Sequence, residues 1–458
     1  MDYQAQLATI VPTQITGQIV RTVGNAAAAA GFPAPVGSLV EIERQGGTPI
    51  SGEVIGFQNE LTLVYPFGTL SGVRRGHRIR LVQTTRYLKV GDGLLGRVLN
   101  AHGKPLDGAP EPVSTERVPL DANAPAAVER PRIDAPLSTG IRTLDALLTC
   151  GRGQRMGIFS GAGVGKSTCL GMMARYSSAD VIVIGLIGER GREVNEFIER
   201  DLGLDGLRRS VVVLATSDEP ALLRVQSALA ATAIAEYFRS QGKEVLLLMD
   251  SVTRFAQAHR EVGLAAGEPP TTRGYPPSTF SALSRLVERA GRTRAGSITA
   301  FYSVLVDGDD PNEPISDTMR GLLDGHTFLS RKIAAQGRYP AIDVLESISR
   351  LMSDIAPQPH KDAAQTVRQL LAAYRDHEDL ISIGAYRNGS NPTVDTAIAM
   401  QPSIQAFLRQ RVDEVVTIEQ ARQQLLDLAA RCAGTRGSSA SDGTPRPQAA
   451  NQRTLAKA

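Results

Sequence analysis

The sequence predicts an α/β protein that has a small β-barrel or sandwich, a parallel sheet covered by helices, and a helical C-terminal region. Short alternating segments separated by glycine run from about Thr16 to Val90, with the spacing of about 8 to 12 residues that is typical of small all-β domains. Continuously apolar strands alternate with helical patterns from about Arg142 to Arg350, as a sheet buried on both faces requires. From about Gln365 to Ala430 the apolar residues follow the helical period.

These patterns divide the chain into four expected segments. They are a β-domain at residues 1–90, an α/β domain at 91–350, a helical domain at 351–431 and a basic tail at 432–458. The tail has almost no apolar side chains to bury, so we expect it to be disordered. The Pro- and Ala-rich segment 119–140 is expected to be a linker that wraps onto the α/β domain.

Length and composition exclude several classes of protein. The chain has 458 residues, of which 42% are hydrophobic and 21% charged, close to the averages of folded globular proteins. A small disulfide scaffold and a disordered protein are therefore excluded. The three cysteines, Cys150, Cys169 and Cys432, have neither disulfide nor metal-ligand spacing, which fits a reducing compartment.

The sequence predicts neither a membrane span nor a secretory signal. Apolar runs such as Val181 to Ile187 are far shorter than the roughly 18 to 20 residues that a span needs. The N-terminus has an acid at position 2, Pro12 within its apolar stretch and no basic segment, unlike a secretory signal. The expected location is the cytoplasm.

A glycine-rich segment after a predicted strand is the main chemical feature. Residues 151–168, GRGQRMGIFSGAGVGKST, combine a strand, a glycine-rich turn and a helix that begins near Lys166. Glycines at such a turn let backbone N–H groups surround phosphate oxygens. We expect the nucleotide phosphates to be bound by Gly161, Ala162, Gly163, Val164, Gly165, Lys166, Ser167 and Thr168.

Two side chains of this segment have specific expected roles. Lys166 would bridge the β- and γ-phosphates, and the hydroxyl of Ser167 would bind Mg²⁺. Ser160 stands where the strict phosphate-loop pattern has glycine. That position begins the turn, so the departure leaves the phosphate-binding prediction in place.

Two acidic residues follow buried strands at the same predicted sheet edge. Asp250 ends EVLLLMD, where it can hold a water of the Mg²⁺ shell or cap the next helix. Glu189 follows the strand 181–187; alone it would be a solvated loop residue, but beside a phosphate loop we expect it to orient or deprotonate the attacking water. Arg190 would either sense the γ-phosphate or pair with Glu193.

Six segments of the chain are specific enough to compare with known families. They are GRGQRMGIFSGAGVGKST, LIGERGREV, MDSVTRFAQAHREV, GYPPSTFSALSRLVERAG, VDGDDPNEPISDTMRGLLDGH and YPAIDVLESISR. Together they resemble the flagellar protein-export ATPases, relatives of the type III secretion ATPases and of the catalytic subunits of rotary ATP synthases. The resemblance extends from about residue 16 to about residue 431.

The resemblance implies an N-terminal β-barrel, a RecA-like nucleotide domain and a helical C-terminal domain, with six copies forming a ring. It gives Lys166, Ser167, Asp250 and Glu189 the same roles as the residue analysis. Arg350 aligns with the arginine finger that reaches the neighbouring subunit's nucleotide, a contribution of about 10³ to 10⁵ in rate. Outside this context, Arg350 would be an ordinary surface arginine.

Tyr339 aligns with the aromatic residue that stacks on adenine, although it could also be an ordinary half-buried tyrosine. The loop GAYRNGSNP, residues 384–392, corresponds to loops that face the pore and the export substrate. In the family the N-terminal extension contacts a negative regulator. Here about 15 residues precede the first strand pattern and Pro12 interrupts any helix, so this segment is weakly supported as a regulator site.

The sequence therefore predicts an ATPase with ATP and Mg²⁺ that powers flagellar protein export as a homohexamer, without nucleic acid. The resemblance implies as partners a regulator or stator protein, the export-gate membrane proteins, a stalk protein, and export substrates with their chaperones. It also implies a cytoplasmic location, peripherally associated with the inner-membrane export apparatus.

Four alternatives remain open. A virulence secretion ATPase is disfavoured by DGDDPNEPISDTMRGLLDGH, and a rotary synthase subunit by the presence of Arg350 in the same chain. An RNA translocase would need basic and aromatic residues in an RNA module, whereas the chain has 5% aromatics, no tryptophan and a net charge of +3. An inactive structural subunit is disfavoured by Glu189.

Overall fold

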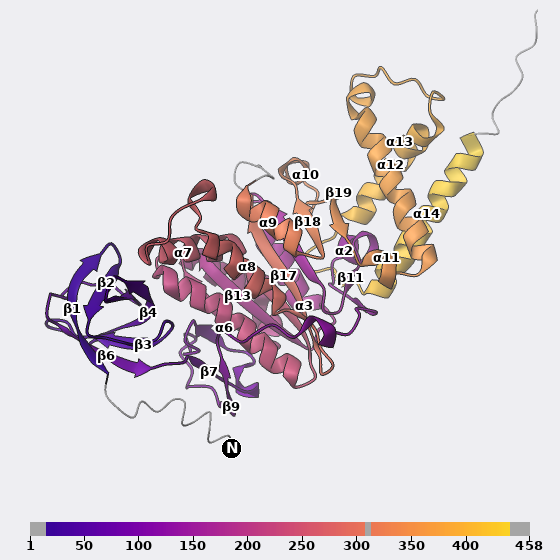
Figure 1. The fold of residues 1–458 in the computed structure, drawn as a ribbon. Coiled ribbons are helices and arrows are strands. Elements are labelled where there is room, and N and C mark those ends of the chain that lie inside the picture. The colour runs from indigo at the N-terminus through magenta and orange to yellow at the C-terminus, as the bar shows by residue number, and fades with distance from the viewer. Residues whose placement is uncertain (1–14, 307–312, 440–458) are drawn as a thin grey trace, which may run out of the picture.

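The computed structural model describes residues 15–306 and 313–439. A β-barrel lies at one end, a sheet with helices on both faces occupies the middle, and long helices extend from the other end (Figure 1). This is the fold class that the sequence predicts. Pro12, residues 307–312 of the DGDDPN segment and residues 440–458 of the expected tail lie outside the described residues.

Six strands of the described chain close into a barrel in the order β1-β2-β5-β4-β3-β6, and β6 pairs back onto β1. All their pairings are antiparallel, and alternate side chains such as Ile42, Val54 and Ile79 fill the interior. The strands are β1 (Thr16–Val23), β2 (Ala26–Ala30), β3 (Leu39–Ile42), β4 (Ile50–Gln58), β5 (Leu61–Pro66) and β6 (Arg78–Gln83).

Strand β2 has no alternating pattern that would predict it. It consists of five alanines, which favour helix in isolation. In the barrel, Ala26, Ala27, Ala28 and Ala29 are completely buried, between β1 and β5. Pairing on both edges outweighs the local helix preference, since strand formation depends strongly on tertiary context.

The connection from the barrel adds strands to two sheets. Strand β7 (Tyr87–Val90) pairs with β9 (Glu116–Pro119), while β8 (Val98–Asn100) joins the edge of the central sheet beside β14. The predicted linker 119–140 contains the short 3-10 helix η2 (Ala127–Glu129) and ends at β10 (Pro136–Leu137), which pairs with β11 (Cys150–Gly151).

Over the described residues, the central sheet has nine strands, with the path β19-β18-β12-β17-β15-β13-β14-β8 and β16 paired to β17. Neighbours are parallel from β18 to β8, whereas β19 and β16 are antiparallel to their partners. The bounds are β12 (Arg155–Ser160), β13 (Val181–Glu189), β14 (Ser210–Thr216), β15 (Glu244–Asp250), β16 (Gly291–Arg292), β17 (Ser297–Leu305), β18 (Gly325–Leu329) and β19 (Ile342–Ser349).

Helices cover both faces of this sheet, which explains why its strands are continuously apolar. On one face lie α6 (Ala221–Ser240), α7 (Val252–Ala265), α8 (Pro277–Glu288) and α9 (Pro314–Leu322). On the other lie α2 (Arg142–Leu147), α3 (Lys166–Tyr176), α4 (Gly191–Glu196), the π-helical turn η3 (Phe197–Leu202) and α5 (Gly203–Arg208). Short helices η1 (Asp92–Leu94), η4 (Thr272–Gly274) and α10 (Arg331–Ala335) lie in connections.

The C-terminal helices α12 (Gln358–Ser382), α13 (Pro392–Leu408) and α14 (Ile418–Ser439) follow the short α11 (Met352–Ile355) and share a hydrophobic core with α2. Helix α14 includes the first eight residues of the segment 432–458 that the sequence predicts as a tail. Cys432 continues the buried face of that helix, which accounts for the extension. Among the described residues, no helix is both long and apolar enough to cross a bilayer.

Candidate functional site

The carboxyl ends of parallel strands bring the predicted site residues to one edge of the sheet. Strands β12, β17, β15 and β13 are consecutive neighbours, and they end at Ser160, Leu305, Asp250 and Glu189. The glycine-rich loop leaves the edge at β12 and enters α3 at Lys166. Crevices outside the carboxyl ends of such strands are the usual ligand sites of open α/β sheets.

The loop backbone requires glycine at several positions. Gly163 and Gly165 have φ angles of +77° and +88°, a left-handed conformation that other residues rarely adopt. A methyl group at Gly161 would lie 2.6 Å from two guanidinium nitrogens of Arg331. Ser160 is the last residue of β12 and is buried, so it belongs to the strand that leads into the turn.

The remaining loop residues lie at the amino end of α3. Ala162 is exposed, Val164 is buried, and Ser167 and Thr168 are half-buried in the first turn of the helix. The first N–H groups of a helix have no partner within it and carry partial positive charge. The loop and helix start can therefore hold an anion.

Lys166 lies between the two predicted carboxylates. Its Nζ is 2.5 Å from Oδ1 of Asp250 and 3.8 Å from Oε1 of Glu189, and the Ser303 hydroxyl donates to the same Asp250 oxygen at 2.8 Å. Burial lowers the pKa of Lys166, but attraction to Asp250 and Glu189 outweighs it, so the pKa lies above its usual value. The lysine therefore stays charged at physiological pH.

Of the two carboxylates beside Lys166, Glu189 lies farther from the lysine ammonium group. Its Oε1 atom is buried and makes no hydrogen bond to the described residues. Burial, followed by repulsion from Asp250, raises the pKa of Glu189 to about 7. The side chain is placed by a bulge at Gly188, where φ is +70° and the register between β13 and β14 shifts. A carboxyl group with this pKa can exchange a proton near neutral pH.

Tyr339 lies on the phosphate-loop side of the sheet. It lies three residues before the start of β19, and a methyl group at Gly165 would lie 3.5 Å from two of its ring carbons. The residue is 46% exposed, so it is accessible to a ligand at the surface. The Gln410 N–H donates to the Tyr339 carbonyl at 3.0 Å, which joins this residue to the C-terminal helical region.

Arg350 lies at the opposite edge of the sheet. Strand β18 is parallel to β12 and β19 is antiparallel to β18, with Leu329 paired to Ile342 near the loop and Gly325 paired to Ser349 at the far end. The eight residues of β19 span about 25 Å at roughly 3.3 Å per residue. The structure therefore brings Tyr339, but not Arg350, to the phosphate loop of the same chain.

Arg190 and the loop 384–392 are both at the surface. The Arg190 guanidinium binds Glu193 at 3.0 Å and its side chain is 76% exposed. Of the two roles expected for Arg190, the structure shows the pair with Glu193. The loop 384–392 is largely exposed between α12 and α13, and the Asn391 side chain caps α13 by accepting from two backbone N–H groups.

Sequence reasoning missed three residues that contact the predicted ones. Ser303 was detectable as a polar residue in the apolar strand SITAFYSVL. Arg331, packed over Gly161, and Gln410, bonded to Tyr339, have no local signal, because long-range folding creates both contacts. Gln410 is buried, and its side-chain oxygen accepts from the Arg142 N–H at 2.8 Å.

Two family models match the chain. Residues 140–349 match the nucleotide-binding domain of the ATP synthase alpha/beta family. Residues 356–427 match the T3SS EscN ATPase C-terminal domain. The first match contains the glycine-rich loop, both carboxylates and Tyr339.

Curated relatives and solved structures match nearly the whole chain. The flagellum-specific ATP synthase of Bacillus subtilis is 50% identical over 414 residues, 90% of this chain and 94% of the relative. The type 3 secretion system ATPase of Xanthomonas euvesicatoria is 50% identical over 423 residues, 92% and 96% of the two chains. The assembled ATPase EscN from enteropathogenic E. coli, in complex with its central stalk EscO, is 43% identical with a TM-score of 0.84, over 90% of this chain and 100% of that one.

Proposed function

We propose a function from one premise: the chain belongs to the family of flagellum-specific ATP synthases and type 3 secretion system ATPases, and it is an ATP-hydrolysing enzyme. The specific proposal is a homohexamer that hydrolyses Mg-ATP at subunit boundaries to power flagellar protein export. The observation that supports it best is the buried cluster of Lys166, Asp250 and Glu189 beside the glycine-rich loop.

The residues present fit Mg-ATP. Loop N–H groups and Lys166 would hold the phosphates, and Tyr339 would stack on the adenine. The Ser167 hydroxyl and the Asp250 carboxylate offer oxygen atoms of the kind that Mg²⁺ prefers. Ser167 would bind the ion, and Asp250 would hold a water of its shell. When bound, Mg²⁺ neutralises charge on the phosphates.

Glu189 would orient the attacking water and accept its proton. A general base works best when its pKa lies near the working pH. Burial raises the pKa of Glu189 to about 7, which meets this requirement near neutral pH. Arg190, at the amino end of α4, would sense the γ-phosphate by leaving Glu193 when nucleotide is bound.

The raised pKa of Glu189 predicts the acid limb of the pH profile. Only the deprotonated carboxylate can accept a proton, so kcat/KM for ATP should fall below about pH 7, the pKa of the free enzyme. Because Glu193 also raises this pKa, Glu193→Gln should move the limb to lower pH. Protonation of ATP itself affects the unchanged protein and the Glu193→Gln variant equally, so it cannot cause a difference between their pH profiles. An acid limb at the same pH in both proteins would contradict the assignment of that limb to Glu189.

The position of Arg350 supports a nucleotide site that is shared between two subunits. It is exposed about one strand length from its own phosphate loop, so it can act on a nucleotide only at a neighbouring subunit. A head-to-tail interface that repeats this contact closes into a ring. We therefore propose that Arg350 completes the site of the next subunit.

A shared site predicts that turnover depends on assembly. ATP turnover per subunit should rise with protein concentration and reach a plateau as rings form, because an isolated subunit lacks the neighbour's Arg350. The measurement is steady-state ATPase activity over a dilution series, with sizing at the same concentrations. Full activity in a fraction that sizing identifies as monomer would refute the shared site.

The proposed partners and location follow from the relatives. The EscN structure contains a central stalk, so we propose that this ring binds a stalk protein, a regulator or stator protein and the export-gate membrane proteins. Substrates and chaperones would meet the loop 384–392, at the cytoplasmic face of the inner-membrane export apparatus. Flagellar and secretion relatives are equally similar at 50% identity. The sequence of the segment 307–326 favours the flagellar system.

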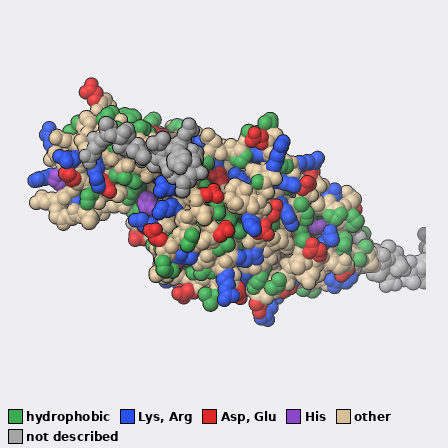
Figure 2. Space-filling model, turned by 90° about the horizontal axis from the view of Figure 1, so that it is seen from below, with side chains coloured by type: hydrophobic (Ala, Val, Ile, Leu, Met, Phe, Trp, Pro, Cys, Tyr) green, Lys and Arg blue, Asp and Glu red, His purple; other side chains and the backbone are tan. Residues whose placement is uncertain are grey.

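An RNA translocase is the weaker proposal. On the face shown in Figure 2, Lys and Arg side chains are interspersed with Asp and Glu and form no continuous basic stripe. Nucleic-acid binding relies on such a stripe. Salt-sensitive stimulation of turnover by RNA would favour that alternative.

A further inference from the structure

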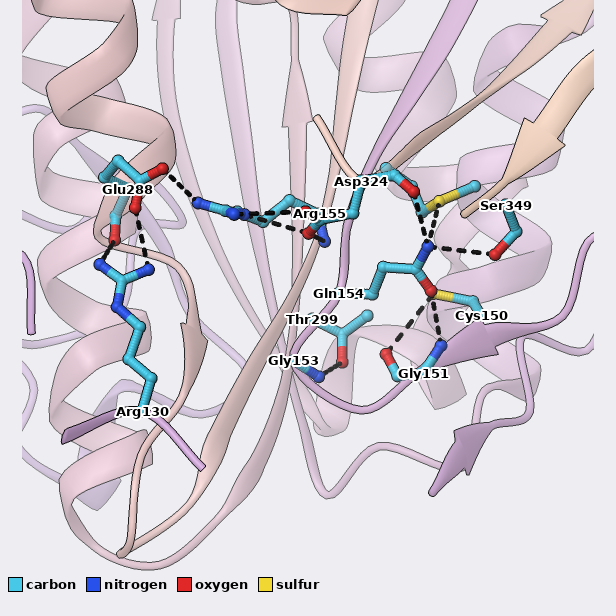
Figure 3. Close-up of polar contacts among 11 residues, drawn as sticks. Arg130, Cys150, Gly151, Gly153, Gln154, Arg155, Glu288, Thr299, Asp324 and Ser349 are labelled. Atoms are coloured by element: carbon cyan, nitrogen blue, oxygen red, sulfur yellow. Dashed lines mark hydrogen bonds and ion pairs between the residues drawn. The ribbon is translucent and has the colours of Figure 1, made fainter. Parts of the chain in front are cut away.

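The starts of β12 and β18 meet the end of β19 at the sheet edge that carries Arg350. Figure 3 shows the polar contacts at this edge. Gly325 at the start of β18 pairs with Ser349, and Asp324 precedes it. The Asp324 carbonyl accepts the backbone N–H of Arg350 at 3.0 Å. The position of Asp324 therefore sets the point from which the Arg350 side chain projects.

Gln154 holds both residues next to Arg350. It is completely buried, and its Nε2 donates to the Asp324 carbonyl and to the Ser349 hydroxyl, each at 3.1 Å. Its Oε1 accepts the Gly151 N–H at 2.8 Å, which fixes the orientation of the amide. In Figure 3 the Gln154 amide points between Asp324 and Ser349 on one side and toward Gly151 on the other.

Arg155 fixes the Asp324 carboxylate. Its Nε and backbone N–H donate to Oδ2 at 3.1 and 3.0 Å, and its Nη2 reaches Oδ1 at 3.3 Å. The Asp324 N–H donates back to the Arg155 carbonyl at 2.9 Å. On its other side, Arg155 binds Glu288 at 2.6 Å, and Glu288 binds Arg130 at 2.9 Å. A forked contact of this kind restricts geometry more than a single bond.

The Arg350 guanidinium, in contrast, is weakly held. It donates to the carbonyl of Arg320 at 3.3 Å, and within 15–306 and 313–439 no carboxylate pairs with it. The backbone is thus fixed while the charged group stays available. A catalytic side chain that must meet a nucleotide on another subunit needs this combination, since a misplacement of 1 Å can cost about 10²-fold in rate.

We propose that Gln154, Arg155 and Asp324 form a clamp that positions Arg350 for the neighbouring subunit's site. The inference rests on the proposed trans role of Arg350. The clamp residues touch no nucleotide of their own chain, because the phosphate loop lies at the other end of β12, six residues away, or about 20 Å at roughly 3.3 Å per residue. Damage to the clamp should therefore lower kcat without raising KM for ATP.

The first test is Asp324→Asn, with Gln154→Leu as a second variant. Each should lower kcat roughly 10- to 100-fold, the range expected for misplaced catalytic groups, with KM unchanged. The matched control is Asp107→Asn. Asp107 binds Nε and Nη2 of Arg97 and the backbone N–H of Val98 in a similar forked contact. Val98 begins β8, and Arg350 follows β19, the strand at the other end of the sheet path. An equal loss of kcat in Asp107→Asn would overturn the clamp proposal, because breaking any forked arginine–aspartate contact would then lower kcat, whatever its position.

The decisive test asks on which subunit the defect acts. Asp324→Asn subunits are mixed with an excess of Lys166→Ala subunits, which cannot turn over but retain Arg350 and its clamp. Turnover per Asp324→Asn subunit should rise by the factor that the substitution removed, because its own site now faces an intact arginine. A purely structural role at the sheet edge predicts no rise.

A parallel mixture of Arg350→Ala subunits with an excess of Lys166→Ala subunits separates the clamp proposal from the proposed trans role of Arg350. Recovery of both variants supports the clamp. Recovery of Arg350→Ala but not of Asp324→Asn would overturn the clamp and leave the shared site intact. Failure of both, in mixed rings verified by sizing, would refute the trans role of Arg350 and the clamp with it.

Discussion

Glu189→Gln should stop ATP hydrolysis and leave nucleotide binding intact. The amide has the size of the carboxyl group but cannot accept a proton, and loss of a general base typically costs 10²- to 10⁴-fold. Binding should persist because the substitution leaves unchanged the loop glycines and Lys166, which would hold the phosphates. The measurements are steady-state turnover and the dissociation constant of ATP for the same preparation.

Glu196→Gln provides a matched control for this substitution. Glu196 lies on α4 and forms an exposed pair with Arg192, so its amide variant should retain normal turnover. Thermal unfolding of the Glu189→Gln protein should show no loss of stability, because burial and repulsion from Asp250 already disfavour the charged form of Glu189, and the amide carries no charge. Substantial turnover by Glu189→Gln would exclude Glu189 as the base.

The local parts of the site were predictable because parallel strands impose their own geometry. Asp250 and Glu189 each end an apolar run, and the carboxyl ends of parallel strands must meet at one sheet edge. The helix start at Lys166 followed from the glycine turn. No residue pattern, however, indicates that Lys166 lies within 2.5 Å of Asp250, since that distance depends on strand order.

The less predictable parts depend on contacts between distant segments. The alanines of β2 form a strand only because β1 and β5 enclose them. Tyr339 and Arg350 belong to one short motif in the sequence, yet β19 carries them to opposite edges of the sheet. Under the proposed function, this separation would let one motif serve two nucleotides, with the tyrosine at its own site and the arginine at the neighbour's.

Strand β12 has a corresponding dual position. Its carboxyl end leads into the phosphate loop, and its amino end holds Asp324 through Arg155. In the proposed ring, this central strand would join the nucleotide of one subunit to the backbone that carries the arginine of the next subunit's site. In a ring with shared sites, this connection would be a physical route by which occupancy of one site biases its neighbour.

Arg350→Ala should nearly abolish turnover, and the loss should be complemented by a second inactive variant. An arginine finger contributes about 10³ to 10⁵ in rate, so the pure variant should be almost inactive. Lys166→Ala should also be inactive, through loss of phosphate binding. Mixed rings contain boundaries where an intact phosphate loop from Arg350→Ala faces an intact Arg350 from Lys166→Ala, and those boundaries should hydrolyse ATP.

The expected amount follows from ring geometry. In an equal random mixture, each boundary needs the correct subunit on both sides, so about one quarter of the boundaries of a head-to-tail ring become active. Coupling between sites would lower the fraction of active boundaries. The turnover of the mixture should still be far above the summed turnover of the two pure variants. If verified mixed rings stay as inactive as their components at every ratio, Arg350 does not act across the boundary. The length of β19, about 25 Å, would then keep it from its own phosphate loop and leave it without a catalytic role.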